Sequence, residues 1–356
     1  MRAAPRNRFM PGTVMGFRGP HKVAGMTQIG YSAMCEQFAP NELLDYTVAA
    51  EQAGFSGAMV ADHFQPWVPQ QGQAAYVWNV MTAIGERTEG DVGPGVTCPS
   101  FRQHPAVIAQ ASATLEAMYP GRHWLGLGSG EALNEHILGQ YWPQAPERIA
   151  MMFEAIDIIR GLFDAGLKKK DVKYDGKYFK LESTRLWTMP DAPPPIYVAT
   201  AGPITAKKTG QFCDGIITVG ANAEKIQKVF AKFAEGARAA GKDPDEMPKL
   251  LQLHLSWAPT DEEALANAVT EWPNGGMKFP KQDIKSPLDF EQMAKLVRPE
   301  DFEGRMLITS DVDKHRAEIQ RYVDMGFDRI YLHNVGRNQH EWAKVFGEQV
   351  LPKLTH

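Results

Sequence analysis

Short apolar runs alternate with longer amphipathic segments from residue 28 onward. The short runs are typical of buried strands, whereas the longer segments repeat apolar residues at helical spacing. Start signals such as Thr260-Asp261-Glu262 support several of the helices. The predicted strands are Gln28–Ser32, Gly57–Ala61, Asp91–Val96, His123–Gly128, Ile196–Thr200, Gly215–Thr218, Leu250–Ser256 and Arg329–His333. The predicted helices include Glu42–Ala53, Val77–Arg87, Ala106–Met118, Arg148–Phe163, Ala223–Ala240, Asp261–Glu271 and Lys314–Met325.

The repeated strand–helix order predicts parallel strands joined by helical crossovers, which is an α/β fold. Because eight strands are predicted, we expect a closed (β/α)8 TIM barrel formed by residues 26–356 as one catalytic domain. Insertions interrupt the order after the fourth and seventh strands. Residues 171–182 predict a β-hairpin with Asp175-Gly176 as its turn. Residues 272–304, rich in Pro, Gly and Lys, predict a long insertion of the kind that covers active sites.

Composition narrows the class of protein. The chain has 356 residues and a net charge of −4, which argues against nucleic acid or an anionic membrane as a partner. Three scattered cysteines without a CxxC pair predict a reducing, cytoplasmic location and no metal site. No apolar run reaches the roughly 18 residues of a membrane span. Residues 1–25 contain five Lys or Arg and lack the apolar core of a secretory signal, so we expect a flexible extension there.

The run ADHFQPW at residues 61–67 directly follows the second predicted strand. Barrel active sites lie at the carboxyl ends of the strands, so this position favours catalysis. His63 beside Asp62 offers a general base, and the aromatic residues offer an apolar wall. In isolation the same pair would more often be structural, with Asp62 capping the loop and His63 bonded within it.

The run GLGSGEALNE at residues 126–135 follows the fourth predicted strand. Its glycines allow the backbone to approach a flat cofactor, and Glu131 could serve as an acid facing it. A Rossmann dinucleotide turn is the alternative, and it requires an acid at the end of a strand about 20 residues on. The acid at that distance, Glu154, falls instead in the predicted helix Arg148–Phe163, which argues against the Rossmann alternative.

Other strand ends and charges add weaker signals. Residues 93–99 and 199–203 end strands in small residues and proline, which suits a ligand but equally suits ordinary turns. Glu36 follows the first strand, whereas Lys281 and Arg305 flank the long insertion. His333 ends the last strand, where we expect a structural histidine rather than a catalyst.

Three motifs together resemble the coenzyme F420-dependent glucose-6-phosphate dehydrogenase family of the luciferase-like superfamily of (β/α)8 barrels. They are EQFAP at 36–40, DHFQPW at 62–67 and GEALNE at 130–135, and they occur in the order and at the spacing of that family. The resemblance extends from about Ile29 to the C-terminus.

The resemblance implies oxidation of a hexose 6-phosphate to its lactone, with hydride transfer from carbon 1 of the sugar to carbon 5 of F420. His63 would take the hydroxyl proton, Glu131 would protonate the reduced ring, and Trp67 would shield the developing charge. Glu36 matches a further active-site acid, so the base remains open between His63 and Glu36. Relatives are usually homodimers, which we expect here also.

The resemblance also assigns ligand contacts. The expected F420 contacts are Asp62, Gly95, Val96, Cys98, Ser129, Gly130, Glu131, Asn134, Thr200, Ala201, Gly202 and Pro203. The expected substrate contacts are Glu36, Trp67, Val219, Asn222, Lys281 and Arg305. A non-prolyl cis peptide bond, common after strand three in this superfamily, would fall at Gly95–Val96.

One departure from the family pattern leaves the substrate open. The family holds its sugar phosphate with two lysines and an arginine; Lys281 and Arg305 match two of them, and the third position is Asn222. A non-phosphorylated secondary or lipid alcohol is therefore the alternative substrate. A barrel that binds flavin or deazaflavin without turnover is a third hypothesis, and the presence of both His63 and Glu131 argues against it.

Overall fold

A computed structural model describes residues 26–355. Eight parallel strands form one sheet in the order β3-β2-β1-β11-β9-β8-β7-β4. Parallel bridges between Val92 and His123 and between Thr97 and Leu127 join β3 to β4, so the sheet closes into the predicted TIM barrel. All eight strands lie where the sequence predicted them. They are β1 (Gln28–Ala33), β2 (Gly57–Val60), β3 (Asp91–Pro94), β4 (Leu125–Leu127), β7 (Ile196–Ala199), β8 (Gly215–Val219), β9 (Lys249–Ser256) and β11 (Arg329–Asn334).

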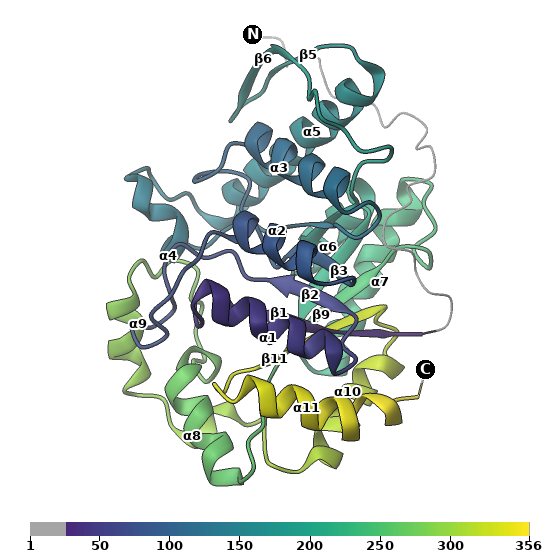
Figure 1. Ribbon diagram of the computed structural model, residues 1–356. Coiled ribbons are helices and arrows are strands. Elements are labelled where there is room, and N and C mark those ends of the chain that lie inside the picture. Colours follow the sequence, from purple (N-terminus) through teal and green to yellow (C-terminus); the bar gives the residue numbers. More distant parts are fainter. Residues whose placement is uncertain (1–25, 356) are drawn as a thin grey trace.

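Helices surround the barrel (Figure 1). The predicted ones are confirmed within a few residues, and Thr260 caps α8 by accepting a hydrogen bond from the backbone N–H of Glu263. Two further helices, α6 and α11, were not among those predicted. The helices are α1 (Pro40–Gln52), α2 (Val77–Arg87), α3 (Pro105–Met118), α5 (Ala145–Lys168), α6 (Pro203–Phe212), α7 (Ala223–Ala239), α8 (Asp261–Glu271), α10 (Val312–Asp324) and α11 (Gln339–Gln349).

The side chains of each strand alternate between two cores. Inward-facing Trp124, Tyr197, Leu250 and Tyr331 pack with Met59 and Ile217 inside the barrel. Outward-facing residues of the same strands pack against the helices in a larger cluster. Glycine makes room for the inner layer, because a Cβ at Gly93 would lie 2.2 Å from the Trp124 ring. The barrel is therefore a filled core whose loops meet at the carboxyl ends of the strands.

Both predicted insertions are present. Strands β5 (Val172–Asp175) and β6 (Lys180–Thr184) form the predicted antiparallel hairpin. Its turn was predicted too short, since residues 176–179 separate the paired Asp175 and Lys180. Glu154 of α5 explains the longer turn: its carboxylate accepts the backbone N–H groups of Lys177, Tyr178 and Phe179 at 2.7–3.1 Å. Glu154 thus has a structural role, which is inconsistent with the Rossmann alternative.

The segment between β9 and α10 contains the second insertion and folds into short elements of its own. They are α8, the 3-10 helices η2 (Pro273–Gly275) and η3 (Pro299–Phe302), helix α9 (Pro287–Ala294) and strand β10 (Leu307–Ile308), which pairs with β9. On the left in Figure 1, α8 and α9 lie on the same side of the barrel as the short helix α4 (Ala132–Glu135). The backbone N–H of Ala132 donates to the carbonyl of Gln282 at 2.8 Å, which joins the insertion to the loop after β4. The short 3-10 helices η1 (His136–Leu138) and η4 (Leu351–Lys353) complete the chain. The predicted extension, residues 1–25, lies outside the described residues.

Candidate active site

The structure brings together the four residues that the sequence singled out as catalytic. They come from the loops after β1, β2 and β4. His63 Nε2 lies 3.9 Å from Glu36 Oε1, and the rings of His63 and Trp67 have centroids 5.2 Å apart. The Glu131 carboxylate interacts electrostatically with both His63 and Glu36. An acid, a base and an aromatic wall therefore face one site.

Glu36 is the most unusual group of this set. Its side chain is fully buried, and neither carboxylate oxygen has a hydrogen-bond partner among the described residues. An unbonded buried carboxylate is costly, because burial removes the water that solvated it. Such a group is suited to accept a hydrogen bond from a hydroxyl of a bound ligand.

His63 is held in one orientation by its own loop. Its Nδ1 lies 3.0 Å from the carbonyl oxygen of Gln65 and 3.3 Å from Asn134 Nδ2. A carbonyl only accepts and an amide nitrogen only donates, so Nδ1 can bond to one of the two; the shorter contact places the proton on Nδ1, and the Asn134 contact is then not a hydrogen bond. Nε2 then carries the lone pair and faces Glu36, as a general base requires.

Asn134 connects this histidine loop to α4. Its side-chain oxygen accepts the backbone N–H groups of Phe64 and Gln65 at 2.9 and 3.3 Å. Gln65 Nε2 in turn donates to the carbonyl of Leu133 at 2.6 Å. The loops carrying His63 and Glu131 are therefore bonded to each other, and their relative position does not depend on a ligand.

Trp67 forms part of an apolar wall that the sequence did not predict in full. It packs edge-on against Phe290 of α9 and contacts Trp272, with ring centroids 5.2 and 6.3 Å apart. Leu133 and Met277 belong to the same buried cluster. The long insertion thus supplies the far side of the wall, and low polarity strengthens electrostatic contacts in the site.

Glu131 occupies the N-cap position of α4, directly after Gly130, whose φ is +81°. A side chain at Gly130 would also collide with Cys98 Sγ, since its Cβ would lie 2.6 Å away. Burial raises the pKa of Glu131, and the Glu36 charge adds to this rise, whereas His63 and Lys281 oppose it. A carboxyl with a raised pKa retains a proton at higher pH and is therefore suited to act as an acid.

Of the two predicted substrate cations, Lys281 acts electrostatically on this acid, and Arg305 acts on Lys281. Lys281 Nζ donates to the carbonyl of Asn274 at 2.6 Å, and Arg305 contacts the carbonyl of Met277 at 3.4 Å. Burial lowers the pKa of Lys281, the neighbouring Arg305 lowers it further, and Glu131 raises it. Two mutually repelling cations held by backbone carbonyls are favourable for an anionic ligand group.

The predicted F420 contacts lie in the loops after β2, β3, β4 and β7. The Gly95–Val96 peptide bond is cis, which confirms that expectation. Glycines bring these loops together: a Cβ at Gly95 would lie 2.3 Å from Met59 Cγ, and one at Gly128 would lie 2.6 Å from Val96 Cγ2. Glycine at these positions therefore allows close packing of the loops at the strand ends. The F420 roles of these residues remain predictions.

Asp62 has structural partners that sequence reasoning missed. Arg102 Nη2 donates to Asp62 Oδ1 at 3.0 Å, and Thr97 Oγ1 donates to Asp62 Oδ2 at 2.8 Å. Arg102 Nε also donates to Glu135 Oε1 at 2.9 Å. Arg102 therefore links the loops after β2 and β4 through two buried carboxylates. Any F420 contact by Asp62 must use its backbone or a remaining lone pair.

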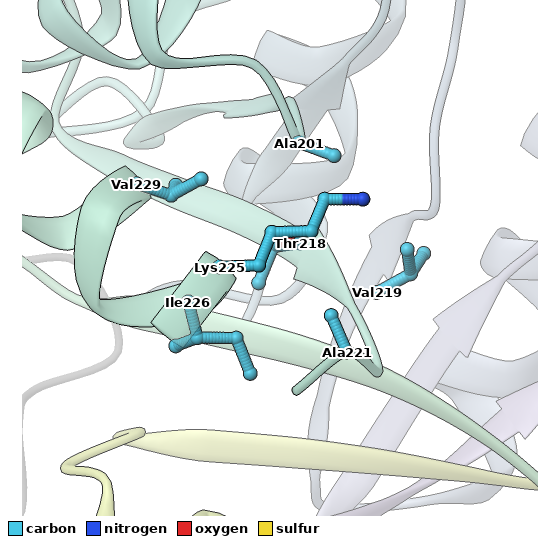
Figure 2. Close-up of a pocket in the computed structure, with 7 residues that line it drawn as sticks. All are labelled: Ala201, Thr218, Val219, Ala221, Lys225, Ile226 and Val229. Carbon is cyan, nitrogen blue, oxygen red and sulfur yellow. The ribbon is translucent and has the colours of Figure 1, made fainter. Parts of the chain in front are cut away.

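A small pocket lies beside the ends of β7 and β8 and includes two predicted contacts, Ala201 and Val219. Its lining is Ala201, Thr218, Val219, Ala221, Lys225, Ile226 and Val229. Figure 2 shows the Lys225 side chain extending past the end of β8, with its ammonium toward Ala201. Asn222 caps α7 and accepts the backbone N–H of Lys225 at 3.0 Å. Its side-chain oxygen therefore has a structural partner, and its substrate role remains a prediction.

His333 is the structural histidine that the sequence predicted. It is buried, and its two ring nitrogens contact His254 Nδ1 at 2.8 Å and Gln37 Oε1 at 3.3 Å. Sequence reasoning did not single out His254, which was one polar position in an alternating strand.

Comparison with known proteins adds independent findings. A family model described as luciferase-like monooxygenase matches residues 18–329. The F420-dependent glucose-6-phosphate dehydrogenase of Microbacterium testaceum is 37% identical over 330 residues, which cover 92% of this chain and 97% of that protein. The enzyme of the same name from Mycobacterium tuberculosis is 36% identical over 332 residues, which cover 92% of this chain and 98% of that protein.

Solved structures give the same fold. An F420-dependent secondary alcohol dehydrogenase in complex with an F420-acetone adduct superposes with a TM-score of 0.86 and 33% identity, covering 93% of this chain and 99% of that one. The coenzyme F420-dependent tetrahydromethanopterin reductase from Methanopyrus kandleri has a TM-score of 0.75 at 21% identity, covering 92% of this chain and 99% of that one. At that lower identity the likeness shows the fold alone.

Proposed function

The chain belongs to the luciferase-like monooxygenase family, and on that premise we propose that it is an F420-dependent dehydrogenase that oxidises a hexose 6-phosphate to its lactone. The names of its curated relatives support this proposal. The observation that carries it is the buried Glu36 carboxylate, which has no hydrogen-bond partner in the described chain and faces the Nε2 of His63. Glu36 and His63 are thus two alternative hydrogen-bond acceptors for one substrate hydroxyl.

His63 and Glu36 prepare the substrate alcohol. His63 Nε2 accepts the hydroxyl proton, and the Glu36 charge stabilises the imidazolium that results. Removal of this proton weakens the adjacent C–H bond toward hydride loss. Trp67 and Trp272 exclude water from the group that becomes charged, so the attraction between Glu36 and the protonated His63 is not screened.

F420, when bound, supplies the deazaflavin ring that accepts the hydride. The chain fits a flat ring in one respect: glycine at 95, 128 and 130 lets the strand-end loops pack closely beside the place where the ring would lie, because a Cβ there would lie 2.3–2.6 Å from the side chains of Met59, Val96 and Cys98. Glu131 lies at the same edge, and burial raises its pKa, which favours the protonated form. It is therefore placed to protonate the coenzyme as the hydride arrives.

The proposed coenzyme is tested by binding. The purified protein is expected to bind F420 and to bind FMN and NADP much more weakly, as measured by quenching of protein fluorescence. This expectation rests on the curated relatives, which are named for their dependence on F420. Equal or tighter binding of FMN would reject F420 as the coenzyme.

Lys281 and Arg305 favour a phosphorylated substrate. Changing Arg305 to Ala is expected to raise the Michaelis constant for a hexose 6-phosphate by roughly tenfold or more, because a charged hydrogen bond contributes about 1.5–3 kcal/mol. Turnover at saturation should change less, since the phosphate lies away from the reacting carbon.

Arg316→Ala is the matched control for this experiment, because Arg316 pairs with Asp313 on α10. It should leave the Michaelis constant unchanged. If Arg305→Ala behaves like this control, the phosphate binds elsewhere or is absent from the substrate.

A dehydrogenase of a non-phosphorylated secondary or lipid alcohol is the second proposal. It is supported by the 33% identity to the F420-dependent secondary alcohol dehydrogenase and by Asn222 in place of a third cation. An F420-binding barrel without turnover is the third; the unbonded Glu36 beside His63 and the raised pKa of Glu131 argue against it.

Location and assembly belong to the same proposal. None of the helices in residues 26–355 combines the length and apolar character that a membrane span requires. We expect the enzyme to work in the cytoplasm as a homodimer, with a small sugar phosphate as its partner and without nucleic acid or membrane. Sedimentation of the purified protein measures the oligomeric state.

A further inference from the structure

Behind the Trp67–Trp272 wall, three polar side chains form a hydrogen-bonded chain that ends at the site. His254 and His333 are paired residues of neighbouring strands β9 and β11. Their Nδ1 atoms lie 2.8 Å apart, and His333 Nε2 lies 3.3 Å from Gln37 Oε1. The inner end of this chain is Gln37, and its outer end is the half-buried His254.

The inner end determines where the protons lie. Gln37 Nε2 donates to the carbonyl of Val335 at 2.7 Å and lies 3.3 Å from Glu271 Oε2, so its amide nitrogen faces two acceptors. Gln37 Oε1 is then the atom facing His333 and can only accept. His333 Nε2 therefore carries a proton. Burial lowers the pKa of His333, with His254 adding to the effect, so the ring is neutral and its Nδ1 is an acceptor.

The proton between the two rings must then come from His254. Its Nδ1–H donates to His333 Nδ1 at 2.8 Å. Burial and the charge of Lys281 together lower the pKa of His254 to about 4, so this ring is also neutral near pH 7. Its Nε2 consequently has a free lone pair, and no donor within residues 26–355 bonds to it.

His254 adjoins the catalytic residues through Trp272 and the charge of Lys281. Its ring lies against Trp272 at a centroid distance of 5.0 Å, and Trp272 contacts Trp67, which lies against His63. The charge of Lys281 acts on both His254 and Glu131. An acceptor on an aromatic platform, beside the cation expected to bind phosphate, is arranged to receive a sugar hydroxyl.

We propose that His254 Nε2 accepts a hydrogen bond from a substrate hydroxyl other than the one that is oxidised, so that the site selects a polyhydroxylated substrate over a plain alcohol. This inference rests on the proposed function and makes its substrate class specific. A site built to bond a hydroxyl discriminates against an analogue that lacks it, because its own polar group is left unpaired.

The test combines deletion of the acceptor with deletion of the donor. F420-loaded wild-type protein is assayed with a hexose 6-phosphate and with its 2-, 3- and 4-deoxy analogues. One analogue is expected to lose roughly tenfold in kcat/KM, as for the loss of one neutral hydrogen bond. His254→Phe keeps the ring against Trp272 and removes both nitrogens. Relative to the wild-type protein, this variant should lose the same factor in kcat/KM on the parent sugar and no further activity on that one analogue. Its F420 affinity should be unchanged.

His340→Phe is the matched control. His340 belongs to α11, and its ring lies edge-on to that of Tyr46, with ring centroids 4.8 Å apart. It should preserve the wild-type preference. The proposal is overturned if His254→Phe lowers kcat/KM equally for the parent and all analogues, or leaves the parent unaffected. The wild-type measurement can also overturn the proposal without any variant, if kcat/KM is equal for the parent and every analogue. No turnover of the parent would reject the proposed function itself, and this inference with it.

Discussion

Replacing His63 by phenylalanine is expected to lower turnover by a factor of about 100 to 10,000, the usual contribution of general acid–base catalysis. The Phe ring retains the contact with Trp67 and the volume of the imidazole, so folding should be preserved. It removes Nε2, which faces Glu36 at 3.9 Å. Affinity for F420 should change little, because His63 is not among the expected coenzyme contacts. Turnover is measured by deazaflavin absorbance and affinity by fluorescence quenching.

The His340→Phe variant is again the control, since it makes the same chemical change outside the site. Comparison with Glu36→Gln then identifies the base. If His63 is the base, Glu36→Gln loses only the stabilisation of the imidazolium and retains part of the activity. If Glu36 is the base, Glu36→Gln suffers the larger loss. Full activity of both variants would remove these residues from the mechanism.

Replacing Glu131 by glutamine is expected to lower turnover by a similar factor, because an amide donates hydrogen bonds but supplies no proton. It should also change the dependence on pH. Burial raises the pKa of Glu131, and its protonated form is the active acid, so wild-type turnover should fall as pH rises through that pKa. The variant has no such group, and its residual turnover should lack this alkaline limb.

A second buried acid provides the control for the pH profile. Burial raises the pKa of Glu116 to about 7, although the backbone N–H groups of Gly121 and His123 oppose the rise. The Glu116 carboxylate, on α3, lies near the amino end of β4 and therefore far from the carboxyl ends of the strands, which carry the site. If Glu131→Gln keeps the wild-type limb and Glu116→Gln removes it, the limb reports stability, and Glu131 is not the acid.

The barrel was predictable because each strand is a short apolar run followed by a helix, and this order admits few topologies. The positions of the motifs followed from this strand–helix order, because the carboxyl ends of all the parallel strands lie at the same edge of the barrel. Helix α6 carries mixed apolar and polar residues without a strong stripe, whereas α11 has Trp342, Ala343 and Phe346 at helical spacing and could have been predicted. The hairpin turn was mispredicted because Glu154, in the preceding helix α5, determines its length.

The site was predictable only where a motif is continuous in sequence. His63 and Glu131 stand in such motifs, and their loops follow from the strands that precede them. Arg102 binds Asp62 and Glu135 across 40 and 33 residues of chain, and no local pattern marks it. His254 resembles any polar residue in an alternating strand until its neighbour His333 and the Gln37 amide fix its proton. Contacts of this kind depend on tertiary structure.

The most direct test of the central claim is hydride transfer to F420. The absorbance of oxidised F420 is followed with the purified protein and, in turn, glucose 6-phosphate, glucose and 2-propanol. We expect rapid loss of absorbance with glucose 6-phosphate and much slower loss with the other two substrates. Loss of absorbance with 2-propanol and none with glucose 6-phosphate would contradict the proposed function.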